Sequence, residues 1–181
     1  NGDDTVRFSK LYPEGTIYTF EPDPRLTEFL LAKFKKFKNI KFYSKAIFSS
    51  TTRLPFNLAH SENQMNFKNT GSSSILDYKK ESSKKFNKKT EVDTVHLTEI
   101  KELRENKIDL IWIDVQGAER IIIESHMEFF QKSNLIWIEY GEDDYTDFYT
   151  RAEVIKAFRQ THSVSFFSNR GCKGNLLLVR L

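Results

Sequence analysis

The chain has one cysteine, Cys172, and no long apolar run among its 181 residues. A single thiol cannot form an internal disulfide, which fits a reducing compartment. No apolar stretch approaches the roughly 20 residues that a membrane helix needs, and no N-terminal stretch joins a basic start to an apolar centre and a small-residue cleavage site. The sequence therefore predicts neither a membrane span nor a signal peptide, and we expect a cytoplasmic location.

A large excess of charge of one sign is also absent, because 28 Lys and Arg stand against 25 Asp and Glu, for a formal net charge of +3. Much of the positive charge comes from lysines within 32–45 and 78–89, which we interpret as solvated faces and not as a nucleic-acid footprint. The chain lacks an aromatic-basic stripe and the Asn/Asp-Pro-Pro-Tyr/Phe segment suited to the exocyclic amines of bases. No nucleic-acid partner is predicted.

The sequence also lacks three patterns that mark common catalytic or metal sites. No cysteine–histidine cluster has zinc spacing, and neither a Gly-x-Ser-x-Gly elbow nor a phosphate-binding loop occurs. We assign no metal site. No internal repeat or interdomain linker is found, so we expect a single domain over residues 1–181, a length that can bury a substantial core.

Hydrophobic periodicity divides the chain into alternating helices and strands. We expect helices at 3–12, 24–39, 99–105 (capped by Thr98), 118–130 and 151–161. We expect strands at 17–21, 40–43, 53–58, 90–96, 108–113, 135–140, 163–168 and 175–180. The segment 78–89 is expected to form a lysine- and serine-rich helix or a mobile segment. This alternation predicts an α/β fold with parallel strands.

The last two expected strands are joined by the short segment 169–174. A parallel crossover needs a dozen or more residues, so this pair should be antiparallel. A mostly parallel sheet that is flanked by helices and closed by a C-terminal antiparallel hairpin is typical of the Rossmann-like methyltransferase fold. We expect that fold here.

Two apolar strands end in an acid, Glu21 in the first case and Asp114 in the second. Ligands bind beyond the carboxyl ends of the strands of an open parallel sheet, so both carboxylates should face one crevice. Glu21 follows Gly2 by about 20 residues, the spacing at which an acid meets ribose hydroxyls. The alternative for Glu21 is a surface residue before a turn.

Several segments together resemble the FkbM-type methyltransferases, which use S-adenosylmethionine and mostly methylate oxygens, often of sugars. The resemblance lies in Asn1-Gly2-Asp3-Asp4-Thr5, 14–24, Lys45-Ala46-Ile47, Gly71-Ser72-Ser73-Ser74, 108–119 and 136–139. Two residues depart from the family pattern: Gln116 replaces the usual glutamate, and Thr98 stands where an aspartate is frequent. The family strand order 3-2-1-4-5-7-6 also places a first strand before Asn1. We expect a gap in the sheet unless preceding residues or, alternatively, a partner chain supply that strand.

The resemblance implies a cofactor site for S-adenosylmethionine. Its expected members are Asn1, Gly2, Asp3, Thr5, Glu21, Pro22, Asp23, Lys45, Ala46, Ile47 and Asp114. Glycine permits close backbone approach, and the free N–H groups of a helix start suit the methionine carboxylate. Glu21 would accept both ribose hydroxyls, and Lys45 to Ile47 would flank the adenine. Asp23 either reaches the adenosine or only starts a helix, and Asp3 is also an ordinary capping residue.

Asp114 is the first candidate for catalysis, because it lies where the methyl end of the cofactor and the acceptor should meet. It could orient the methionine amino group, take the acceptor proton, bind a metal, or merely cap the helix at 118. Glu139 ends the neighbouring strand, and such a pair can raise one pKa or chelate a cation. His60 could reach over the site as a general base. Glu119 is expected to bond backbone groups instead of doing chemistry.

Three functions remain in competition. The leading one is O-methylation of a hydroxyl, with a sugar acceptor implied by the resemblance, where Ser72, Ser73 and Glu139 would contact the acceptor unless the serines simply form a turn. The second is a non-catalytic methyltransferase-like binding module, supported only by Gln116. The third is a nicotinamide-dependent oxidoreductase, against which the terminal hairpin argues. The sequence leaves the acceptor and the oligomeric state open.

Overall fold

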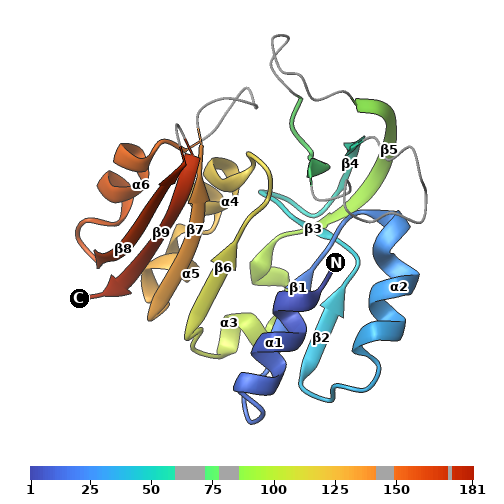
Figure 1. Cartoon of the computed structure of the whole chain (residues 1–181), viewed down its shortest axis with the longest axis horizontal. Helices are drawn as coiled ribbons and strands as arrows, with labels where there is room; N and C mark the ends of the chain where they lie inside the picture. Colours follow the sequence, from blue (N-terminus) through green and yellow to red (C-terminus); the bar gives the residue numbers. More distant parts are fainter. Residues whose placement is uncertain (60–71, 78–85, 142–148, 171–172) are drawn as a thin grey trace.

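The computed structural model describes residues 1–59, 72–77, 86–141, 149–170 and 173–181. These residues form a mixed α/β structure in which the strands belong to three small sheets (Figure 1). The C-terminus follows β9 of the four-stranded sheet, and the N-terminus lies near β1 (Figure 1). Within the described residues, no helix has the length and apolar character to cross a membrane.

The first sheet pairs β1 (Ile17–Phe20) with β2 (Ile40–Tyr43) in parallel. Between them runs α2 (Pro24–Phe34), preceded in the chain by α1 (Asp3–Leu11). Asp23 caps α2 by accepting the Arg25 N–H, and a proline in the first turn suits the fixed φ of that position. The buried face of α2 is apolar and packs with parts of α1 and β2; it comprises Leu26, Leu30 and Phe34.

The second sheet has the order β3-β5-β4, formed by Ala46–Ile47, Phe86–Val95 and Arg53–Ala59. The expected strand at 53–58 is confirmed. Of the segment 78–89, expected to be a helix or a mobile segment, residues 78–85 lie outside the described residues, and the rest belongs to β5 instead. Lys88 and Lys89 pair antiparallel with Leu58 and Asn57 and keep exposed side chains. Cross-strand pairing therefore overrides a composition that suggested a solvated helix.

The helix expected at 99–105 is shorter and begins differently. A 3₁₀ turn, η2 (Leu97–Glu99), precedes α3 (Lys101–Glu105). The predicted Thr98 cap is wrong, because the ring of His96 accepts the Thr98 N–H at 3.3 Å and caps the turn. This arrangement buries the apolar side chains Leu97, Ile100 and Leu103.

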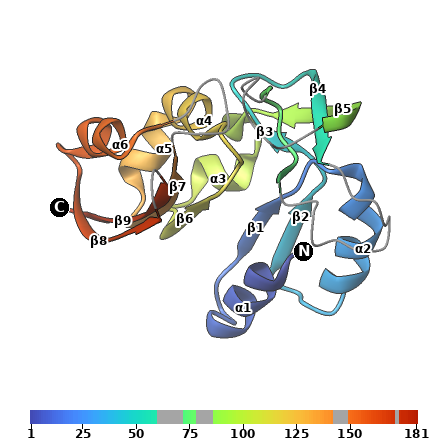
Figure 2. The same cartoon turned by 45° about the horizontal axis from the view of Figure 1, so that its top comes forward.

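The third sheet has the order β6-β7-β9-β8, formed by Leu110–Ile113, Leu135–Tyr140, Lys173–Arg180 and His162–Arg170. β6 and β7 are parallel, whereas β9 is antiparallel to both β7 and β8, which confirms the C-terminal hairpin. The helices α4 (Glu119–Ser125), α5 (Met127–Lys132) and α6 (Arg151–Phe158) lie on one face of this sheet (Figure 2). The main apolar core lies at this interface and includes Ile122, Ile123, Phe130, Ile136, Ile138, Val154, Phe158, Leu176 and Leu178.

The single helix expected over 118–130 is divided at His126 into α4 and α5. His126 leaves helical geometry (φ −124°, ψ 25°), and its ring is 2% exposed. Nδ1 lies 2.8 Å from the Ile122 carbonyl oxygen, and Nε2 accepts the Leu97 N–H at 3.2 Å. The ring thus joins α4 to the start of η2, and this long-range bond coincides with the break.

The expectation of one mostly parallel sheet is corrected by this topology. Three sheets of two, three and four strands are present, and they are mixed in direction. Among the described strands, no ladder joins β1 to β6, so the two parallel pairs β1–β2 and β6–β7 remain separate. This separation is the gap that the sequence predicted in the sheet, and the hollow lined by β1 and β6 includes it. The candidate site lies where the two strands end, at Glu21 and Asp114.

Candidate active site

A cleft of about 1180 Å³ lies between β1 and β6, and its lining combines both strands with the start of α1. That volume exceeds the range of about 300–1,000 Å³ usual for small-molecule pockets. Ten residues expected from the sequence to hold cofactor or acceptor line this one cleft. They are Asn1, Gly2, Thr5, Glu21, Pro22, Lys45, Ala46, Ile47, Ser73 and Asp114. Glu21 and Asp114 therefore face the same hollow from different sheets.

The start of α1 forms one wall of the cleft, with Gly2 as the residue before the helix. Gly2 is left-handed (φ 74°), and a Cβ built there would come within 2.6 Å of the Phe34 ring and 2.8 Å of Leu30. Only glycine fits this close approach between α1 and α2. Asp3 lies outside the cleft lining and pairs with Lys33 at 2.5 Å.

Glu21 follows β1 directly and lines the cleft together with Pro22. Its Oε1 accepts the Asp23 N–H at 2.9 Å, which orients the carboxyl group at the end of the strand. Burial raises the pKa of Glu21 above its usual range, the nearby charge of Asp23 adds to this effect, and the hydrogen bond from Asp23 opposes it. A buried carboxylate of this kind gains stability from added hydroxyl donors.

Asp23 does not line the cleft, although the sequence placed it among the cofactor residues. It is 1% exposed, and both of its oxygens accept hydrogen bonds from the Arg25 guanidinium, at 2.6 to 3.2 Å. Ser73 Oγ donates to Asp23 Oδ2 at 3.2 Å and accepts the Ala59 N–H at 3.0 Å. Of the two roles left open for Asp23, the structure shows the helix cap, extended here into an anchor for the 72–77 segment.

The other expected acceptor residues are spread around this region. Ser73 lines the cleft, Ser72 does not, and His60 lies outside the described residues. Lys45, Ala46 and Ile47 reach the cleft from the start of the second sheet, where Ala46 and Ile47 form β3 beside β5. The 72–77 segment is thus fixed beside the cleft through Asp23 on one side and β4 on the other.

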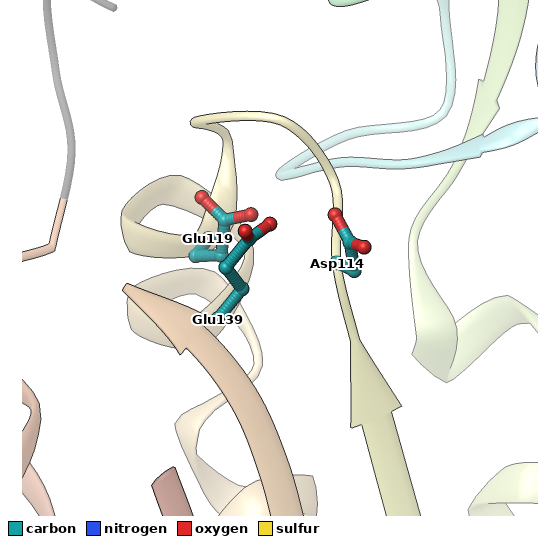
Figure 3. A group of neighbouring side chains, drawn as sticks. All are labelled: Asp114, Glu119 and Glu139. Atoms are coloured by element: carbon teal, nitrogen blue, oxygen red, sulfur yellow. The ribbon is translucent and has the colours of Figure 1, made fainter. Parts of the chain in front are cut away.

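Three carboxyl groups gather beyond the ends of β6 and β7, each from a different element (Figure 3). Asp114 follows β6, Glu139 belongs to β7, and Glu119 opens α4, with oxygens that all lie within 4.8 Å of one another. Glu139 does not itself line the cleft, but one of its carboxyl oxygens lies within 4.8 Å of a carboxyl oxygen of Asp114. The structure therefore brings together the two acids that the sequence proposed as a catalytic pair.

Burial and mutual repulsion raise the pKa values of two members of this cluster. Burial first, then the charge of Asp114 and the hydrogen bond to it, raise the pKa of Glu139 to about 8, while Lys173 opposes the rise. Burial raises the pKa of Glu119 to about 7, although its hydrogen bonds to backbone N–H groups oppose this. At neutral pH the cluster therefore retains part of its protons, which is the state that a general base and its partner need.

Glu119 has the structural role that the sequence indicated. Its Oε1 accepts the Val115 N–H at 2.9 Å, and the side chain is 5% exposed. This bond closes the turn between β6 and α4, in which Gly117 has a φ of 98°. Three carboxylates at this spacing are oxygen donors that a divalent cation would accept, but Glu119 is engaged with the backbone and we assign no metal.

Two contacts of this turn were not foreseen from the sequence. Gln116 Nε2 donates to Asp114 Oδ1 at 2.6 Å, and Ser74 Oγ donates to the Gln116 carbonyl oxygen at 2.8 Å. The expectation that Asp114 might cap the following helix is not met, because α4 begins after Ala118 without a side-chain cap. No signal in the sequence indicates the contact between Gln116 and Asp114, because that contact depends on the left-handed backbone of Gln116.

Comparisons with known proteins identify the family of this chain. The model of the methyltransferase FkbM domain matches residues 1–166. The chain is also similar to the 2-O-methyltransferase NoeI of Sinorhizobium fredii (strain NBRC 101917 / NGR234), with 27% identity over 183 residues, covering 98% of this chain and 75% of that protein. No solved structure matches. The match to the domain covers most of the chain, and the protein therefore belongs to the FkbM methyltransferase family.

Proposed function

We propose that this methyltransferase uses S-adenosylmethionine to methylate a hydroxyl group of a sugar within a glycan. The observation that carries the proposal is the placement of the α1 start, Glu21 and Asp114 around one cleft. The name of the similar 2-O-methyltransferase NoeI supports transfer to an oxygen. The strand orders β1-β2 and β6-β7-β9-β8 support a Rossmann-like arrangement in which Glu21 and Asp114 lie at the carboxyl ends of parallel strands.

The residues of the cleft suit the parts of this cofactor. Free N–H groups at the start of α1 would receive the methionine carboxylate. Glu21 would accept the ribose hydroxyls, and Lys45 to Ile47 would pack beside the adenine. The bound cofactor supplies a sulfonium methyl carbon as the electrophile.

The acidic cluster would handle the acceptor. Asp114 would take the proton of the acceptor hydroxyl, and Glu139, whose carboxyl oxygen lies within 4.8 Å of that of Asp114, would share that proton. A positioned base contributes about 10²–10⁴-fold, and holding the hydroxyl at the methyl carbon contributes further. Ser73, which lines the cleft, is our candidate for contact with the acceptor.

Cofactor binding distinguishes the proposal from its competitors. Calorimetry with S-adenosylhomocysteine and, separately, with NAD should give micromolar-range binding of the former only. Glu21→Ala should abolish that binding, whereas Glu28→Ala, the same change on the exposed side of α2 and outside the cleft lining, should leave it intact. Tight binding of NAD would refute the assignment, and binding of neither ligand would favour a non-catalytic module.

Transfer itself is tested with S-adenosylmethionine labelled in its methyl group. A panel of methyl glycosides that differ in their free hydroxyls should include acceptors of label, and Asp114→Asn should abolish the transfer while S-adenosylhomocysteine still binds. A near-normal rate in Asp114→Asn would remove this residue from the chemistry. Label on amines but not on hydroxyls would refute O-methylation.

A further inference from the structure

Gln116 bonds to the acidic cluster with its side chain and to the 72–77 segment with its backbone. Its Nε2 donates to Asp114 Oδ1 at 2.6 Å, and its carbonyl oxygen accepts the Ser74 hydroxyl at 2.8 Å. We propose that Gln116 is a positioning residue that aims the carboxylate of Asp114 and stabilises it as the proton acceptor, held in place by Ser74. This inference rests on the methyl transfer proposed above.

The backbone of Gln116 shows that its position is held by its surroundings. Its φ of 55° is left-handed, a conformation that few residues other than glycine adopt. Such a conformation persists only where neighbouring contacts determine it. The Gln116 side chain therefore starts from a defined backbone position, from which its amide reaches Asp114.

Ser74 is a rigid anchor for this turn. It is 1% exposed, and its Oγ also accepts the Leu76 N–H at 3.0 Å. Its backbone exchanges two hydrogen bonds with Asn57 of β4, at 2.8 and 3.0 Å. The position of Asp114 is thereby linked, through Gln116 and Ser74, to the second sheet, although Asp114 itself follows a strand of the third.

The charge at position 116 matters because carboxyl groups already crowd this place. Among the described residues, Asp114 and Glu119 add negative charge beside Glu139, and Lys173 adds positive charge. The Gln116 amide donates to the Asp114 carboxylate without adding charge. A carboxylate of the same shape would place another negative charge there, and it would raise the pH at which the cluster ionises by about one to three units.

The first test needs no acceptor. In protein labelled with ¹³Cδ glutamate, the signal of Glu139 is assigned by its loss in Glu139→Gln and followed against pH. We expect its midpoint to rise by about one unit or more in Gln116→Glu. It should rise less in Gln116→Gly, which removes the amide while tolerating the left-handed backbone. Gln160→Glu, the same change at an exposed position after α6, should leave the midpoint where it is.

The second test follows methyl transfer to the glycosides. Gln116→Glu should lower kcat at neutral pH by about ten-fold or more, with recovery at higher pH, because the added carboxylate moves the ionisation of Glu139 to higher pH. Binding of S-adenosylhomocysteine should change less than about two-fold, since the change falls on proton transfer. A purely structural role would lower affinity and kcat together and leave the pH profile in place.

The outcomes separate this inference from the proposed function. If the wild-type protein binds S-adenosylhomocysteine and both Gln116 variants keep the wild-type midpoint of Glu139, the positioning role is overturned and the methyltransferase proposal stands. If the wild-type protein neither binds S-adenosylhomocysteine nor transfers label, both are overturned.

Discussion

A carboxyl oxygen of Glu139, at the end of β7, lies within 4.8 Å of a carboxyl oxygen of Asp114, which follows the parallel neighbour β6. Burial and the nearby charge of Asp114 raise the pKa of Glu139 to about 8. Asp114 alone of the two lines the cleft, so under the proposed function Asp114 would meet the acceptor and Glu139 would act through it.

The first prediction concerns the pH dependence of transfer. Because the pKa of Glu139 is raised to about 8, kcat should increase as pH rises and reach a plateau above that pH. Glu139→Gln removes the like charge, so the rise should move to lower pH. The measurement is kcat against pH for both proteins, with Glu105→Gln, an exposed residue at the end of α3, as the control. Identical profiles for wild type and Glu139→Gln would show that the two carboxyl groups act independently.

The second prediction concerns stability. The pKa of Glu119 rises from 4.5 to about 7 on folding, so the folded protein binds more protons than the unfolded chain between these values. The contribution of protonated Glu119 to stability is fully present below pH 4.5, and the free energy of unfolding then decreases as pH rises toward 7. Glu119→Gln keeps an oxygen for the Val115 N–H and loses the charge.

Between pH 4.5 and 7, the free energy of unfolding of Glu119→Gln should therefore decrease by up to about 3 kcal/mol less than that of the wild type. Urea unfolding at several pH values measures the difference, and Glu105→Gln should follow the wild type. A slope in Glu119→Gln equal to that of the wild type would mean that Glu119 is ionised throughout.

The third prediction concerns the Asp23–Arg25 pair. Asp23 is 1% exposed, so Arg25→Met leaves a buried carboxylate without its cation and should cost about 3 kcal/mol or more. Arg53→Met breaks an ion pair whose partners, Arg53 and Asp93, are both more than half exposed, and it should cost less than about 1 kcal/mol. Urea unfolding compares the two variants. Equal losses would show that Asp23 reaches solvent when Arg25 is removed.

The sequence predicted those features that depend on local pattern. The strands ending at Glu21 and Asp114 and the C-terminal hairpin follow from apolar runs and a short connection, and the structure contains them. The break at His126 was not predicted, because it accompanies a hydrogen bond from Leu97, remote in the chain. The extent of β5 was missed for a similar reason, since pairing with β4 determines it.

The same division holds for the candidate site. Strand ends and a helix start can be located from the sequence, which is why ten of the expected residues, among them Gly2, Glu21 and Asp114, line one cleft. The partners of Asp23 and Gln116 could not be, because they depend on side-chain directions and on a left-handed residue in the turn. Gln116 looked like the loss of an acid, whereas the structure shows a donor to Asp114.

The last prediction concerns proton release on cofactor binding. Burial raises the pKa of Glu21 in the free protein, and two ribose hydroxyls donating to its carboxylate would lower that pKa again in the complex. A group whose pKa falls on binding releases protons, so affinity for S-adenosylhomocysteine should increase as pH rises through the titration of free Glu21. Calorimetry in two buffers of different ionisation enthalpy measures this release directly.

Glu21→Gln provides the matched variant, because it keeps the size of the side chain and cannot titrate. It should bind more weakly, and its binding should release fewer protons than that of the wild type by the amount that Glu21 contributes. Glu28→Gln, on the exposed side of α2, should match the wild type in both respects. Equal proton release from the wild type and Glu21→Gln would mean that the cofactor does not contact this carboxylate, because a direct hydrogen bond to its ionised form must change its proton affinity.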